Sequence, residues 1–124
     1  MRVAVVGAGA VGGVLAAAAA QAGHDVALRV RTPVDQLLVL HDDVETEVPA
    51  EISVDPCGPV ADVVFLVVKA TDTASATEHL AALCGPETLT VAVQNGIDHV
   101  ARVSPYLPPG SGPVVPTLIY VAAK

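Results

Sequence analysis

Apolar residues gather in short runs along the chain, and three of these runs have the length and composition of buried β-strands. They are Arg2–Val6, Asp62–Val68 and Leu89–Val93, each nearly continuous in Val, Leu or Ala. Runs of this kind are typical of parallel strands that are covered on both faces. We therefore predict an α/β fold, a doubly wound and mostly parallel sheet in three layers.

A further strand is predicted for Asp25–Val30, where side chains alternate between the two faces and Arg29 shares a face with Ala27. Between this strand and the first lies an alanine-rich segment of helical length. It ends at Gly23, a residue type suited to the position just after a helix. Strand, glycine-rich turn, helix and second strand form the unit on which dinucleotide-binding domains are built.

The rest of the chain carries weaker patterns that are broken by proline and glycine. A helix is predicted from Thr71 or Asp72, either of which suits an N-cap, to about Cys84. Thr32–Glu51 is expected to be polar and irregular, with a short helix or strand at Val34–Leu40. A short strand is expected at Ile52–Val54, and a short helical stretch is expected to end near Val103. A Pro/Gly linker at Pro105–Pro113 is then followed by a last strand at Thr117–Ala122, with Pro116 at its start.

The turn after the first strand has the sequence Gly7-Ala8-Gly9-Ala10-Val11-Gly12, a G-x-G-x-x-G element. Gly7 permits a sharp turn, Gly9 leaves room for the backbone to approach a pyrophosphate, and Gly12 lets the helix pack closely on the strand. The free N–H groups and the positive dipole end at the start of the helix then face the anion. All six residues are therefore predicted to form a cofactor-binding turn.

The absence of charge over residues 3–23 offers a competing interpretation, a secretory signal or a membrane span. However, four glycines within seven residues make a poor spanning helix, and a single preceding arginine makes a poor basic leader. We therefore expect no membrane contact and a cytoplasmic protein.

Composition narrows the classes of partner. The 124 residues fit one domain, 52% of them are hydrophobic, and aromatic residues make up only 2%. The net charge of −7 and the scarcity of stacking side chains argue against binding to nucleic acid. Cys57 and Cys84 form no C-x-x-C pair, and the four histidines show no spacing typical of a metal site. The stretch His41–Glu47 is interpreted as a solvated acidic loop rather than as a set of metal ligands.

The end of the second strand bears on the choice of cofactor. An NAD site usually has an acidic residue there, which binds the ribose hydroxyls. This chain has Arg29-Val30-Arg31-Thr32 instead, and two of its six basic residues fall in these four positions. Arg31 is predicted to bind the 2′-phosphate of NADP through charge-assisted hydrogen bonds. A solvated surface arginine is the alternative.

Two further polar residues follow predicted strands and are expected at the same edge of the sheet. Lys69 comes after Asp62–Val68, and Asn95 comes after Leu89–Val93. Ligands of open α/β sheets gather beyond the carboxyl ends of the strands, so Lys69 is placed to reach a cofactor phosphate, a ribose or a substrate anion. Asn95 is placed to donate and accept hydrogen bonds there. The alternatives are a lysine that snorkels from a strand end and an ordinary Asn-Gly turn.

Taken together, the segments GAGAVGG, AGHDVALRVR, DVVFLVVKA and VAVQNG resemble, in this order and spacing, the amino-terminal domain of the ketopantoate reductase (2-dehydropantoate 2-reductase) family. The resemblance implies a Rossmann domain and reduction of a 2-keto acid with NADPH in pantothenate synthesis. By position, it also implies a pyrophosphate loop at Gly7, Gly9 and Gly12, a 2′-phosphate ligand in Arg31 and a cofactor-proximal Lys69. Asn95 would lie beside the nicotinamide and the substrate.

The chain departs from the family in length. The family's general-acid lysine and substrate-binding glutamate belong to an all-helical carboxy-terminal domain, for which residues 1–124 have no counterpart. We therefore expect a single NADP-binding domain, residues 1–124, with strand order 3-2-1-4-5-6 and without activity by itself.

Several alternatives stay open. One is a non-catalytic dinucleotide-binding or regulatory module, and another is a reductase of a different 2-keto acid. The partners expected are NADPH and a 2-keto acid substrate. An apolar interdomain face also leaves open self-association as a homodimer, or a carboxy-terminal domain supplied in trans.

Overall fold

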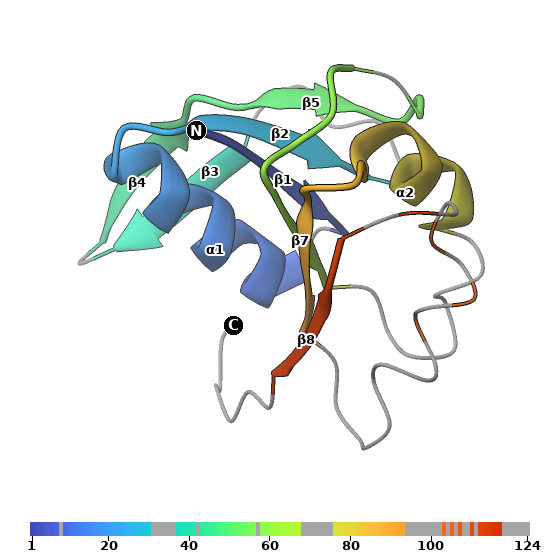
Figure 1. Ribbon diagram of the computed structural model, residues 1–124. Coiled ribbons are helices and arrows are strands. Elements are labelled where there is room, and N and C mark those ends of the chain that lie inside the picture. The colour runs from blue at the N-terminus through green and yellow to red at the C-terminus, as the bar shows by residue number, and fades with distance from the viewer. Residues whose placement is uncertain are drawn as a thin grey trace.

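The computed structural model describes residues 1–7, 9–30, 37–41, 43–56, 58–67, 76–93, 103, 105, 107, 110 and 112–117. Within this part of the chain it has two helices and eight strands (Figure 1). In chain order they are β1 (Arg2–Val6), α1 (Gly9–Gln21), β2 (Asp25–Arg29), β3 (Leu37–His41), β4 (Val44–Val48), β5 (Glu51–Ser53), β6 (Val63–Leu66), α2 (Thr77–Leu83), β7 (Leu89–Val93) and β8 (Val114–Thr117).

Six of the strands form one sheet in the order β5-β2-β1-β6-β7-β8, and every neighbouring pair is parallel. Numbered along the sheet-forming strands alone, this is the order 3-2-1-4-5-6. The predicted strand order and the doubly wound α/β fold are therefore confirmed. Because all six strands run in one direction, their carboxyl ends share one edge, where the order reverses between β1 and β6.

The two helices cover opposite faces of the sheet (Figure 1). Ala16 and Ala19 of α1 pack against alternate residues of β1 and β2, among them Val5 and Leu28. Small side chains on α1 allow its backbone to lie close to these larger strand residues. On the other face, Leu80 and Leu83 of α2 are fully buried. Their cluster includes Ala4, Val6, Ala27, Val64 and Leu66.

Helix α1 ends as its sequence predicts. Gly23 has a φ of +88°, a conformation that glycine adopts without a steric penalty. Its N–H donates to the carbonyl of Ala20, and the N–H of His24 donates to the carbonyl of Ala19. These two bonds form a Schellman motif, which satisfies carbonyls that the end of the helix leaves free. The Nδ1 atom of the His24 side chain lies 3.3 Å from the amino group of Met1.

Two predictions about strands are wrong. The acidic loop expected at His41–Glu47 is instead part of an antiparallel hairpin of β3 and β4, in which His41 pairs with Val44. A two-residue connection allows this, and Asp43 accepts the positive φ of 63° that the tight turn requires. The strand alternative given for Val34–Leu40 agrees with β3 over residues 37–40. The last strand begins at Val114 and not at Thr117, so Pro116 lies inside it, opposite Ala92. At the end of the sheet order, β8 pairs with β7 alone among the described strands, which makes a missing N–H tolerable.

Strand β7 and the end of α2 agree with their predicted bounds: β7 spans Leu89–Val93, and the helix stops before Cys84. The predicted helix start at Thr71 or Asp72 lies outside the described residues. Among the residues that the structure describes, no helix is long and apolar enough to cross a membrane.

Candidate functional site

The glycine turn lies at the carboxyl end of β1, between the carboxyl ends of β2 and β6. Gly7 has a φ of +111°, so the chain turns sharply directly after the strand. Its N–H donates to the carbonyl of Arg29 at 2.8 Å, and the carbonyl of Val6 accepts the N–H of Val67 at 2.9 Å. The turn is therefore held by both neighbouring strands, and the role predicted for Gly7 in forming the turn is confirmed.

Gly12, in the first turn of α1, packs directly on the backbone of that turn. A Cβ at this position would lie 2.5 Å from the carbonyl oxygen of Gly7 and 3.4 Å from Cγ2 of Val67. The obstacle is a backbone atom, which cannot move aside as a flexible side chain would. Glycine here lets α1 begin close to the sheet, which confirms the packing role predicted for Gly12.

The start of α1 has the polarity that an anion requires. The helix begins at Gly9 and continues through Ala10 and Val11, so the N–H groups of its first turn have no partner within the helix. No acidic residue stands in that first turn to compete for them. A pyrophosphate at this point would meet free donors and the positive end of the helix dipole.

The other predicted site residues lie outside the described part of the chain. They are Ala8 in the glycine turn, Arg31, Lys69 and Asn95. Their roles therefore stay predictions.

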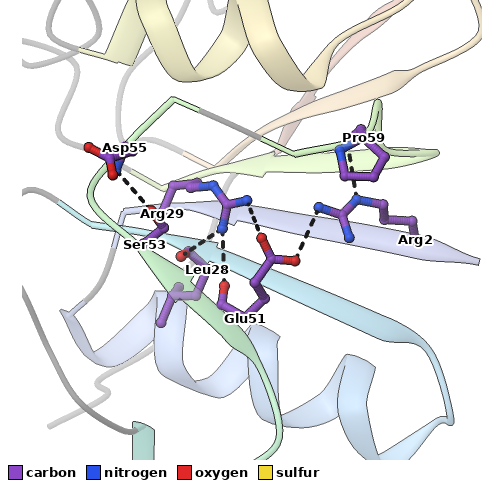
Figure 2. A network of polar contacts seen from close by, with 7 residues as sticks. All are labelled: Arg2, Leu28, Arg29, Glu51, Ser53, Asp55 and Pro59. Atoms are coloured by element: carbon purple, nitrogen blue, oxygen red, sulfur yellow. Dashed lines mark hydrogen bonds and ion pairs between the residues drawn. The ribbon is translucent and has the colours of Figure 1, made fainter.

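Arg29 was grouped with Arg31 by sequence, but the structure gives it a different task. It is only 1% exposed and lies on the face of the sheet covered by α2. Its Nη2 donates to Oε1 of Glu51 at 2.9 Å, and its Nη1 donates to the carbonyl of Glu51 at 3.1 Å (Figure 2). Arg29 is thus engaged within the protein, and it is not a second phosphate ligand. One signal in the sequence pointed to this buried position: Arg29 lies on the same face of the strand as Ala27, and that face is buried.

Glu51 also connects Arg29 with Arg2, and these three residues are called the arginine network below (Figure 2). Nη2 of Arg2 lies 3.6 Å from Oε2 of Glu51, and its Nε donates to the carbonyl of Pro59 at 3.1 Å. Gly58 covers the two guanidinium groups. A Cβ there would lie 2.8 Å from Nη2 of each arginine, and its φ is +110°. The network therefore joins β1, β2, β5 and the loop before β6.

Two titratable side chains near this face have shifted pKa values. Burial, and then the positive charge of Arg29, lower the pKa of His79 on α2 below its ordinary value of 6.5, against the opposing charges of Glu78 and Asp55. Burial raises the pKa of the Cys84 thiol, and its contact with the Thr90 hydroxyl opposes that shift. Cys84 therefore stays a protonated, unreactive thiol at neutral pH.

Comparison with known proteins adds to this geometry. Residues 3–124 match the family model described as ketopantoate reductase PanE/ApbA. A 2-dehydropantoate 2-reductase of Mycobacterium tuberculosis is 36% identical over 126 residues, which cover 98% of this chain and 42% of that protein. One from Caulobacter vibrioides is 39% identical over 102 residues, covering 80% of this chain and 35% of that protein. The crystal structure of a PanE/ApbA family ketopantoate reductase from Ralstonia eutropha superimposes with a TM-score of 0.74 at 31% identity, over 98% of this chain and 42% of that one. The chain thus spans less than half the length of these relatives.

Proposed function

Because this chain belongs to the ketopantoate reductase PanE/ApbA family, we propose that residues 1–124 bind NADPH as the cofactor domain of a 2-keto acid reductase. The observation that carries the proposal is the junction of Gly7, Gly12 and the start of α1 at the carboxyl edge of the sheet. The first N–H groups of α1 have no partner within the helix, and no acidic side chain stands in its first turn.

In this proposal each part of the site has its own task. The turn from Gly7 to Gly12 and the first N–H groups of α1 hold the pyrophosphate. Arg31 binds the 2′-phosphate, and Lys69 binds a phosphate, a ribose hydroxyl or the substrate carboxylate. Asn95 orients the nicotinamide and the substrate carbonyl. Bound NADPH supplies a hydride to that carbonyl, which is the chemistry of the 2-dehydropantoate 2-reductases that this chain resembles.

We also propose that residues 1–124 by themselves bind the cofactor without turnover, because hydride transfer requires a proton donor and the family resemblance implies that this donor is a lysine of the carboxy-terminal domain. A non-catalytic dinucleotide-binding module is the second candidate. An assay with ketopantoate and NADPH tests both statements, because turnover by the pure chain would exclude the module and would also overturn the proposal that residues 1–124 are inactive by themselves. A different 2-keto acid as the substrate is tested by using it in place of ketopantoate in the same assay.

The cofactor assignment is tested by replacing Arg31. Arg31→Ala is expected to weaken NADPH binding by roughly 10- to 100-fold, the loss of one or two hydrogen bonds to a charged group. Binding of NADH, which has no 2′-phosphate, is expected to change by less than about twofold. Isothermal titration with both nucleotides measures this, and Lys124→Ala is the control with the same change of charge. Unchanged NADPH affinity in Arg31→Ala would remove Arg31 from the site and with it the argument for NADP.

A further inference from the structure

We propose that Arg29 is a positioning residue that sets the preference of this site for a phosphorylated adenosine ribose, an inference that rests on the proposed NADPH function. Its side chain is fully buried, with an exposed fraction of 0%. Burying a guanidinium carries a large desolvation penalty, which only well-formed ion pairs and hydrogen bonds offset. An apolar side chain would fill the same space without that penalty, so the fold retains the charge for the contacts it makes.

Those contacts fasten β5 to β2. The two strands share a register of only three residue pairs, Ala27 with Glu51, Leu28 with Ile52 and Arg29 with Ser53. Strand β5 is also the last in the sheet order, with a partner on one side only among the described strands. The Arg29 guanidinium adds a bond to the main chain of Glu51 and another to its carboxylate. The planar guanidinium makes these bonds from two nitrogens in fixed geometry, whereas lysine offers all its donors from a single nitrogen.

The main chain of Arg29 connects β2 with the glycine turn. The carbonyl of Arg29 accepts the N–H of Gly7 at 2.8 Å, which ties β2 to the glycine turn. The next residue, Val30, donates its N–H to the carbonyl of Ser53 at 3.1 Å. The point where the chain leaves β2 is therefore fixed from β1 on one side and from β5 on the other. Arg31 follows Val30 directly in the sequence.

The loop before β6 closes over this arrangement. Gly58 lies so near Nη2 of Arg29 that a Cβ would come within 2.8 Å of it, and its left-handed φ of +110° also excludes most side chains. The guanidinium is thus covered as well as paired, and its carboxylate partner Glu51 is half exposed. Loosening the pair is expected to shift the end of β2, where one bond ties it to the glycine turn. The start of α1 has two further supports, the packing of Gly12 on the carbonyl of Gly7 and the bond from Val67 on the β6 side to the carbonyl of Val6. For this reason the predicted effect falls on the 2′-phosphate and not on the pyrophosphate.

A double-mutant cycle tests the proposal on the full chain. Glu51→Gln keeps the shape of the side chain and removes its charge, and Arg29→Lys keeps the charge and removes the two-armed donor. Each is expected to weaken NADPH binding about 3- to 10-fold and NADH binding less than about twofold. In the Arg31→Ala background, the same substitutions are expected to change NADPH affinity by less than about twofold, because the residue they position is gone. Glu47→Gln, at an exposed position of β4, is the control with the same change of charge.

The outcomes separate the two proposals. If Glu51→Gln lowers the melting temperature but leaves the ratio of NADPH to NADH affinity unchanged, Arg29 has a structural role only and the inference is wrong. It is equally wrong if the loss of NADPH affinity is the same with and without Arg31. If the unsubstituted chain binds neither nucleotide, the proposed function fails first, and this inference fails with it. Arg29→Lys leaves the contact of Glu51 with Arg2 in place. A loss of NADPH affinity in Arg29→Lys therefore does not come from Arg2 alone.

Discussion

At the scale of single residues, Gly12 controls how closely α1 approaches the sheet. Replacing glycine by alanine inside a helix normally raises stability by up to about 1 kcal/mol. At Gly12 we expect the opposite sign, because the added carbon would meet the carbonyl oxygen of Gly7 at 2.5 Å. Gly12→Ala should lower the free energy of unfolding by about 1–2 kcal/mol, a typical cost of overpacking. It should weaken the free energy of NADPH binding by at least the same amount.

Urea unfolding and nucleotide titration measure the two effects of Gly12→Ala. Ala18→Ser, which adds one atom at an exposed position of the same helix, should leave both quantities nearly unchanged. A Gly12→Ala protein that is more stable than the original and binds NADPH equally well would show that the contact with Gly7 does not control the turn.

The glycines could be predicted from the sequence because their requirement is local: a strand end, a turn and a helix start within a few residues of one another. The task of Arg29 could not. Its partner Glu51 is 22 residues away along the chain, in a segment whose strand is short and weakly patterned. The sequence did place Arg29 on the same face as Ala27, but only the long-range pairing of β2 with β5 turns that observation into a buried ion pair.

At the scale of elements, the sheet strands with continuous apolar runs were the easiest to predict, since burial on both faces leaves little room for polar residues. The β3–β4 hairpin was missed because β4 contains three charged or polar residues in a row, a pattern that favours a solvated loop. They are Glu45, Thr46 and Glu47. Two-stranded hairpins keep one face in water, so such a composition is compatible with a strand. The start of β8 was misplaced because Pro116 was taken as the limit of the strand, whereas an edge strand accepts a proline inside it.

Helix α2 supplies a prediction about pH, because it places His79 near Arg29. Burial and the arginine charge lower the pKa of His79 in the folded protein, while in the unfolded chain it stays near 6.5. Below pH 6.5 the unfolded state therefore binds more protons at this residue than the folded state does. The contribution of His79 to the free energy of unfolding is constant above that pH and falls as pH drops from 6.5 through the lowered folded pKa.

His79→Gln removes this titration. We expect urea unfolding at pH 7.5, 6.5 and 5.5 to show a smaller loss of stability on acidification for His79→Gln than for the unsubstituted chain. If the two proteins lose stability in parallel over this range, His79 is not disfavoured as a cation in the folded state.

At the scale of the whole molecule, the order of six parallel strands brings the carboxyl ends of β1, β2, β6 and β7 to one edge, and this order was predicted before the structure was described. The apolar runs and the glycine turn indicated a doubly wound sheet, and the Rossmann domain that the family resemblance implies supplied the order of its strands. The cofactor, the substrate and the partners depend on Arg31, Lys69 and Asn95, which lie outside the described residues, so they remain proposals. The arginine network adds a long-range connection between the glycine turn, β2 and β5 that no local pattern contains.

The central claim, that this edge binds NADPH, is tested most directly by thermal unfolding of the 124-residue chain without ligand, with NADPH and with NADH. A nucleotide at 100 times its dissociation constant stabilises the folded state by about 2.7 kcal/mol, a rise in melting temperature of about 10 °C for a domain of this size. We predict a rise of this order with NADPH and a smaller one with NADH at the same concentration. No rise with either nucleotide would contradict the account.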